Sequence, residues 1–179
     1  MMPASLPRLD HPLVSLRPLL RADAPAWYGY LRDPAVVRHT SWNLDCLDDL
    51  LADFDAYESA DPASPLRLAV VLRDGGQLVG TIGLHTVSPV HRTAEIAYDL
   101  SPAVWKQGVG CAIVTAVAHW SIEQLGLLRL QATVLETNAG SIRLLERCGF
   151  AREGYLRHYR LVRGMPGNFW IYARIAAVP

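Results

Sequence analysis

The stretch that decides the fold is EIAYDLSPAVWKQGVGCAI, residues 95–113. Residues 93–100 are predicted to form a strand, and a long apolar helix is predicted over 108–125. A short loop that ends in Gly108 and Gly110 joins the two. This order directs the unpaired N–H groups of the first helical turn at one point, which attracts an anion. We therefore expect a phosphate or pyrophosphate group to bind at this loop.

The rest of the chain predicts one domain of mixed α/β class. We expect strands at 13–19, 66–72, 78–87, 93–100, 128–135, 155–162 and 169–176. Helices are expected at 24–31, 45–59, 108–125 and 139–148. Hairpins come first and a strand–helix–strand crossover follows, which indicates a single mixed sheet. Residues 1–12 contain three prolines and are predicted to be a flexible arm that precedes a domain over 13–179.

Composition narrows the class of protein. Seventeen basic residues balance seventeen acidic ones among 179, and 51% of the chain is apolar. This balance argues against a general nucleic-acid or membrane-surface binder. Three cysteines, Cys46, Cys111 and Cys148, lie far apart. Their number and spacing predict no disulfide framework and no metal site, so we expect a cytoplasmic protein without a metal.

The glycine loop also resembles the start of a dinucleotide fingerprint, G-x-G-x-x-G. Ile113 occupies the third glycine position, and six residues, 102–107, separate the loop from its strand. The fingerprint normally follows the first strand of a parallel domain, whereas hairpins precede it here. A nicotinamide-binding oxidoreductase is therefore a disfavoured alternative.

Two segments carry a more specific resemblance. WKQGVG, residues 105–110, resembles the acetyl-CoA loop R/Q-x-x-G-x-G/A of the Gcn5-related N-acetyltransferase (GNAT) superfamily. ETNAGSIRLLERCGF, residues 136–150, is similar to the E-N-x-x-S-x-x-x-x-E-x-x-G-F segment of the RimJ/RimL-like branch, which acetylates the N-termini of ribosomal proteins. The resemblance covers residues 13–176.

This resemblance implies a GNAT fold and activity. The fold would be α/β (α+β), with a single, mostly antiparallel sheet whose βαβ unit splays open to form an acetyl-CoA crevice. Acetyl-CoA would be the cosubstrate. The acceptor would be a protein N-terminus, such as that of a ribosomal protein, or a small amine. The branch often forms homodimers, so a homodimer is expected as well.

The same resemblance implies the residues that contact the cofactor. Main-chain groups at the end of the 93–100 strand would pair with the pantetheine arm, and N–H groups at the helix start would bind the pyrophosphate. Asn138 would cap the following helix or bind pantetheine, and basic side chains would reach the phosphates. The expected cofactor contacts are Tyr98, Asp99, Leu100, Lys106, Gln107, Gly108, Val109, Gly110, Cys111, Ala112, Asn138, Ser141 and Arg147.

Acetyl transfer to an amine needs a group that accepts the amine proton and benefits from one that assists the departing thiolate. Glu95 matches a glutamate that related enzymes use as the base, often through water, and His85 and His91 are alternatives. Leu145 occupies the place where many relatives carry a tyrosine acid. Attention therefore moves to Ser141 as the group that assists the sulfur.

Aromatic residues gather in the N-terminal helical region, which helps to wall the acceptor site in the family. We expect Trp27, Trp42 and His85 to contact the acceptor, although aromatic residues are more often core. The leading function is an acetyl-CoA-dependent N-acetyltransferase that transfers the acetyl group directly to a primary amine. The alternative is a non-catalytic CoA-binding sensor or partner protein, which the leucine at position 145 favours.

Overall fold

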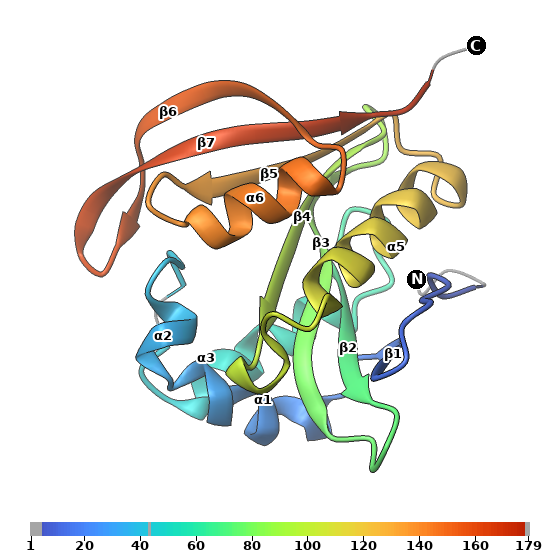
Figure 1. The fold of residues 1–179 in the computed structure, drawn as a ribbon, viewed down its shortest axis with the longest axis vertical. Coiled ribbons are helices and arrows are strands. Elements are labelled where there is room, and N and C mark those ends of the chain that lie inside the picture. The colour runs from blue at the N-terminus through green and yellow to red at the C-terminus, as the bar shows by residue number, and fades with distance from the viewer. Residues whose placement is uncertain (1–4, 43, 178–179) are drawn as a thin grey trace.

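A seven-stranded sheet in the order β1-β2-β3-β4-β5-β7-β6 runs through the computed structural model, which describes residues 5–42 and 44–177 (Figure 1). The strands are β1 (Val14–Pro18), β2 (Leu66–Leu72), β3 (Leu78–Ser88), β4 (Thr93–Leu100), β5 (Arg129–Leu135), β6 (Ala151–Val162) and β7 (Met165–Ile175). Among the strand pairs of the described residues, only β4–β5 is parallel. The predicted single, mixed and mostly antiparallel sheet is confirmed.

The helices lie on the two faces of this sheet. They are α1 (Ala24–Leu31), α2 (Pro34–Val37), α3 (Leu47–Ala52), α4 (Phe54–Tyr57), α5 (Val109–Glu123) and α6 (Ala139–Arg147). Single-turn 3-10 helices precede α1 at Arg21–Asp23 and α5 at Pro102–Val104. Figure 1 shows α5 and α6 side by side on one face, with α1, α2 and α3 at the lower left of the view.

Two cores result from the alternation of side chains along β2. Leu68 and Val70 belong to the larger core, which α5 and α6 cover. Ala69 and Val71 belong to a smaller core with residues of α1, α3 and α4. Successive side chains of a strand point to opposite faces, so one apolar strand supplies both cores. The sheet therefore forms the central layer of a three-layer domain.

The feature that positions the site is the parting of β4 from β5. The two strands pair only at three positions, Thr93–Arg129, Ala94–Leu130 and Glu95–Gln131. Beyond Glu95, β4 continues to Leu100 in pairing with β3, while β5 continues to Leu135 in pairing with β7. The sheet thus opens between its two central strands, and Glu95 lies where the opening begins.

Several element boundaries differ from the sequence prediction. The 45–59 helix is two short helices, α3 and α4, which meet at Asp53. Strands β6 and β7 are longer than predicted, and their turn lies at Arg163-Gly164, where both residues have positive φ. The unpredicted α2 begins where the carboxylate of Asp33 accepts a hydrogen bond from the N–H of Ala35 at 2.8 Å.

The described part of the predicted arm lies against the domain. The indole N–H of Trp120 donates to the carbonyl of Ser5 at 2.9 Å, and Leu6 and Leu9 pack on the larger core. Residues 1–4 of that arm lie outside the described residues.

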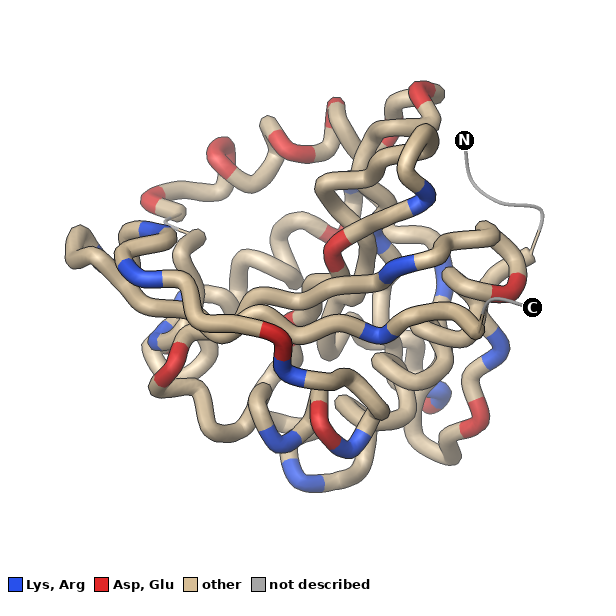
Figure 2. Tube along the Cα trace, turned by 90° about the horizontal axis from the view of Figure 1, so that it is seen from above, with Lys and Arg blue, Asp and Glu red and all other residues tan. Residues whose placement is uncertain are grey.

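Charge is unevenly distributed over the part of the chain that the structure describes, because residues 45–61 contain seven acidic residues and no lysine or arginine. Figure 2 shows stretches of the trace with acidic positions alone and others where basic positions gather. No helix within 5–42 and 44–177 has the length and apolar character needed to span a bilayer.

Candidate active site

A cavity of about 1040 Å³ occupies the opening between β4 and β5. The starts of α5 and α6 line one end of it, and α2, α4 and the β6–β7 hairpin line the other. We call these the cofactor end and the acceptor end, after the roles that the family resemblance implies for them. Glu95 and Tyr98 of β4 lie between them, as do Thr133 and Leu135 of β5.

The cofactor end is built from the first turn of α5. Gly108 is the N-cap, with a left-handed φ of +81°, and its carbonyl accepts the first helical hydrogen bond from the N–H of Ala112 at 3.1 Å. The N–H groups of residues 109–111 therefore have no acceptor within the helix. A Cβ on Gly110 would lie 2.5 Å from Leu144 Cδ1, so glycine lets α5 and α6 approach. This turn can bind a pyrophosphate.

Three basic side chains line the same end of the cavity. They are Lys106, in the loop before α5, and Arg143 and Arg147 on α6. Arg143 and Arg147 are one helical turn apart, so they lie on one face of α6. A phosphorylated ligand at the start of α5 would thus meet positive charge from two elements.

Other residues of the predicted cofactor set have structural partners. The amide of Gln107 donates to the carbonyl of Ala103 at 2.8 Å, so this side chain braces the loop. Val109 is fully buried in the larger core. Cys111 lines the cavity, and its Sγ lies 3.5 Å from that of Cys148. The side chains of Gln107, Val109 and Ala112 do not line the cavity, and the N–H of Ala112 is already bonded to Gly108.

Glu95 is a buried carboxylate, 3% exposed, and not a solvated residue of a strand edge. Its Oε1 accepts a hydrogen bond from Thr133 Oγ1 at 2.5 Å and one from Arg160 Nη2 at 3.4 Å. Its Oε2 accepts one from Gln131 Nε2 at 3.3 Å. His85 Nε2 lies 3.7 Å from Oε1. The carboxylate is therefore held rigidly at the cavity wall, where it can accept a proton directly or through water.

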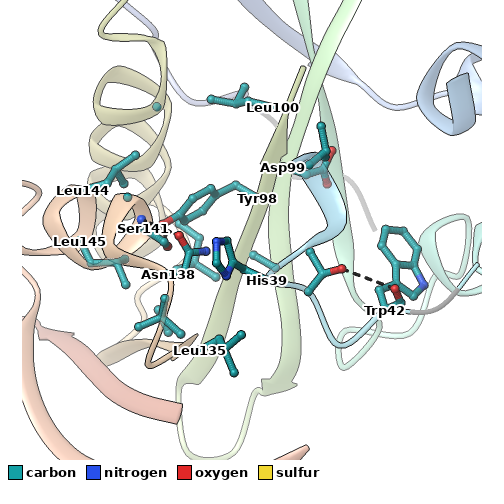
Figure 3. Close-up of a pocket in the computed structure, with 18 of the residues that line it drawn as sticks. His39, Trp42, Tyr98, Asp99, Leu100, Leu135, Asn138, Ser141, Leu144 and Leu145 are labelled. Atoms are coloured by element: carbon teal, nitrogen blue, oxygen red, sulfur yellow. Dashed lines mark hydrogen bonds between the residues drawn. The ribbon is translucent and has the colours of Figure 1, made fainter. Parts of the chain in front are cut away.

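Ser141 lies in the first turn of α6, opposite β4. Asn138 caps this helix as predicted, because its Oδ1 accepts a hydrogen bond from the N–H of Ser141 at 3.1 Å. The Ser141 hydroxyl forms a hydrogen bond of 2.6 Å with the phenol of Tyr98. Figure 3 shows Tyr98 directed at Ser141, with Asn138 and Leu145 close by. Tyr98 thus brings a phenol to the site.

The acceptor end gathers residues from α2 to α4 and from the C-terminal hairpin. His85, Trp42 and Asp53 line it, together with Tyr57 and Phe169. Burial lowers the pKa of His85, although the neighbouring carboxylate of Glu95 opposes that effect. Burial raises the pKa of Asp53. His91 does not line this cavity, so of the two alternative histidines only His85 faces it.

Trp27 does not reach the cavity, in contrast to the sequence prediction. It is fully buried in the smaller core, and its indole N–H donates to Asp99 Oδ1 at 3.1 Å. Its ring lies 5.3 Å from that of Trp42, which does line the cavity. Trp27 therefore supports the acceptor wall from behind.

A buried network centred on Asp99 fixes this wall to the sheet. Besides Trp27, the carboxylate accepts hydrogen bonds from Tyr30 at 2.5 Å, Arg67 at 2.5 Å and Thr81 at 2.7 Å. The side chains of Arg67 and Asp99 are only 10% and 8% exposed. Four donors occupy the Asp99 carboxylate, so its side chain is structural, and only its main chain is available to a cofactor.

The sequence analysis missed several residues of the site, among them Thr133, Arg160 and His39. Thr133 follows Gln131 by two residues on β5, so strand alternation next to Glu95 would have indicated it. Arg160 comes from the β6–β7 hairpin, and His39 follows α2 with its Nδ1 3.3 Å from Thr137 Oγ1. Figure 3 shows the ring of His39 beside Asn138. Burial lowers the pKa of this imidazole. No local pattern marks these last two residues.

A metal centre finds no support in the described part of the chain. Residues 5–42 and 44–177 contain no group of three or more His, Cys, Asp or Glu side chains that could hold an ion.

Comparison with known proteins gives one consistent family. The model of the acetyltransferase (GNAT) domain matches residues 14–151. The uncharacterised N-acetyltransferase YoaA of Bacillus subtilis (strain 168) is 30% identical over 169 residues, which cover 93% of this chain and 96% of that protein. Spermidine N(1)-acetyltransferase of Escherichia coli (strain K12) is 26% identical over 155 residues, with coverages of 87% and 82%.

A solved structure agrees with the fold. The spermidine N-acetyltransferase of Vibrio cholerae, crystallised in complex with CoA and spermine, superposes with a TM-score of 0.81. The match covers 90% of this chain and 95% of that one, at 20% sequence identity.

Proposed function

This chain belongs to the GNAT acetyltransferase family and is an acetyl-CoA-dependent N-acetyltransferase, and we propose that it transfers the acetyl group directly to the primary amine of a small molecule. The observation that carries the proposal is the single cavity that joins the start of α5 to the buried Glu95 and to the acceptor end. Both substrates can meet in such a cavity without a covalent enzyme intermediate.

The cofactor would bind along the parting of the sheet. Its pyrophosphate would accept hydrogen bonds from the N–H groups of residues 109–111, with Lys106 and Arg147 beside it. Its pantetheine arm would run along β4 from Leu100 towards Tyr98, where β4 has no β5 neighbour. The thioester would then lie close to Ser141 and Glu95, and a main-chain N–H of β4 would polarise its carbonyl.

In the reaction the amine nitrogen attacks the thioester carbon, and the bond from that carbon to sulfur breaks. The amine proton passes to Glu95, directly or through water. The electron pair of the broken bond remains on sulfur. Thr133, Gln131 and Arg160 hold the carboxylate in place, so its reach towards the amine is set before the substrate arrives.

A small amine is the acceptor that the surroundings favour. Glu95 is 3% exposed and lies well inside the cavity. The acceptor end combines the aromatic rings of Trp42, Tyr57 and Phe169 with the carboxylate of Asp53. Such a wall suits an amine that carries an apolar part or a second positive charge. The likeness to spermidine acetyltransferases makes polyamines the first acceptors to try.

The segment over 136–150 is the reason to test a protein N-terminus as a second kind of acceptor. We propose the RimJ/RimL-like activity on ribosomal proteins as the second arm, because this segment resembles that branch from Asn138 to Phe150. The predicted cytoplasmic location and the predicted homodimer remain predictions, which fractionation and light scattering would check.

The experiment is an acceptor panel with acetyl-CoA, in which CoA release and the acetylated product are both measured. The panel contains spermidine, an aromatic monoamine, free amino acids and a peptide with a ribosomal-protein N-terminus. We expect turnover with at least one small amine and its loss in Glu95→Gln. Turnover with the peptide alone would overturn the small-amine proposal, and binding of acetyl-CoA without turnover on any amine would favour the sensor alternative.

A further inference from the structure

The proposed reaction needs a group that stabilises the departing CoA sulfur, and this chain lacks the tyrosine that the family resemblance expects for it. Direct transfer releases CoA as a thiolate, which a hydrogen-bond donor can stabilise. Leu145 stands where the family resemblance expects a tyrosine, and it is 1% exposed with an aliphatic side chain. Any assistance to the sulfur must therefore come from another residue.

The hydroxyls of Tyr98 and Ser141 are the nearest replacement. Tyr98 comes from β4 and Ser141 from α6, 43 residues later in the chain, and their oxygens are 2.6 Å apart. Both residues line the cavity. The pair therefore links β4 to the first turn of α6 at the cavity wall, and Figure 3 shows the two side chains directed at each other.

The direction of this hydrogen bond follows from the chemistry of the two hydroxyls. A phenol is a far stronger acid than an aliphatic alcohol, so it is the better donor, and each group has one hydrogen to give. Burial raises the pKa of Tyr98 well above its ordinary value, so the phenol keeps its proton at working pH. Tyr98 donates to Ser141, and the hydrogen of Ser141 is then free to point into the cavity.

We propose that Tyr98 is a positioning residue that directs the hydroxyl hydrogen of Ser141 at the CoA sulfur; this inference rests on the proposed function. The bond between the acetyl carbon and sulfur breaks, and its electron pair stays on sulfur. Ser141 stabilises that thiolate by a hydrogen bond and retains its own proton. The thiolate takes its proton from solvent when CoA leaves. Tyr98 thus takes the role of the missing tyrosine from the opposite side of the crevice, and it acts through Ser141.

A purely structural role for Tyr98 would predict something different. If the phenol only tied β4 to α6, its removal would weaken every CoA-like ligand equally and at every pH. If it acts through Ser141 on the sulfur, its removal would weaken only the thiolate form of CoA. Desulfo-CoA, which lacks the sulfur, separates the two roles.

The experiment is calorimetric titration of CoA and of desulfo-CoA at pH 6.5 and pH 8.5. An ordinary thiol has a pKa of about 8.5, and a site that lowers it by about one unit binds CoA about fivefold more tightly at the higher pH. We expect that gain in the parent protein and no gain for desulfo-CoA. Tyr98→Phe and Ser141→Ala should each abolish the gain, and the double variant should behave like Ser141→Ala alone.

Tyr172→Phe is the matched control. The Tyr172 phenol also donates to α6, at Glu146 over 3.1 Å, but it does not line the cavity. This variant should keep the full pH-dependent gain. If Tyr98→Phe does not fold, 3-fluorotyrosine at position 98 keeps the shape and strengthens the donor, so the gain should increase.

Two results would overturn the inference. One is a Tyr98→Phe protein that keeps the pH-dependent gain, and the other is an equal loss of affinity for CoA and desulfo-CoA. Both leave the proposed function intact. Failure of the parent protein to bind CoA at any pH would instead refute the function itself.

Discussion

The two ends of the cavity differ in the chemical groups that line them. The cofactor end consists mainly of main-chain N–H groups, two glycines and a helix cap in the short segments 105–112 and 138–141, with Arg143 and Arg147 of α6 beside them. The acceptor end consists of side chains from α2 and the segment after it, from α4 and β3, and from the β6–β7 hairpin, which the fold brings together. The first can bind a ligand common to a whole family, because it depends on backbone geometry. The second can vary with each substrate, because single side chains define it.

Glu95 lies where the two ends meet, and its replacement should have the largest effect. Glu95→Gln keeps the shape and the contacts with Thr133 and Gln131 but removes the base, so turnover should fall by roughly 10²–10⁴. Affinity for acetyl-CoA should change little, because the cofactor end does not depend on this carboxylate. Steady-state kinetics and calorimetry on the same preparation check both statements. Turnover within a few-fold of the parent at every pH would remove Glu95 from the mechanism.

Replacement of Asp99 should destabilise the whole acceptor wall. Asp99→Asn leaves the buried guanidinium of Arg67 without its counter-charge, and breaking a buried pair in this way costs about 3–5 kcal/mol of unfolding free energy. Denaturant unfolding measures that loss. The matched control is Asp55→Asn at the surface, where Asp55 is 83% exposed beside Arg21 and where we expect little change. Equal effects of the two substitutions would show that the Asp99 network does not hold the wall.

The cofactor end should respond to one added methyl group. Gly108→Ala strains the left-handed N-cap of α5 by about 1–2 kcal/mol and turns the N–H groups that face the pyrophosphate, so acetyl-CoA affinity should fall by about tenfold. Gly149→Ala is the control, because Gly149 has a similar φ of +78° and lies at the end of α6. Both variants should lose stability, and only Gly108→Ala should lose affinity. Unchanged affinity in Gly108→Ala would mean that the pyrophosphate lies elsewhere.

The smallest expected effect concerns His85 at the acceptor end. Burial depresses its pKa below the ordinary 6.5, and Glu95 partly offsets this, so Glu95→Gln should lower the pKa further. Nuclear magnetic resonance titration of the ring measures both values. Because the folded pKa is below the unfolded one, the unfolded chain takes up a proton first as pH falls, and stability is lost below about pH 6.5. A pKa that rises in Glu95→Gln would contradict the contact between the two residues.

The contrast between the two ends explains which parts of the site the sequence could predict. Gly108, Gly110 and the Asn138 cap follow from local patterns, since helix starts have recognisable residues. Trp27 was assigned to the acceptor wall by its type, and only packing shows that Trp42 lies in front of it. Arg160 reaches Glu95 from the C-terminal hairpin. The first strand of this hairpin begins four residues before the predicted one. The prediction missed that start because residues 151–154 lack an alternating pattern.

The fold itself was predictable down to the order of its main elements. Apolar strands and the long helix α5 carry strong periodic signals, and their crossover allows few topologies. The parting of β4 from β5 carries no such signal, because a strand that leaves its neighbour has the same sequence pattern as one that stays paired. That feature was expected only from the family resemblance, and the register of three pairs now gives its position.

The central claim is that acetyl-CoA enters the sheet where β4 and β5 part. A crystal structure of the complex with acetyl-CoA tests it most directly. The predicted result is a pyrophosphate on the first turn of α5, a pantetheine arm along β4, and a thioester sulfur within hydrogen-bond distance of Ser141. A cofactor bound outside this cavity, or strands β4 and β5 paired along their whole length in the complex, would contradict the account.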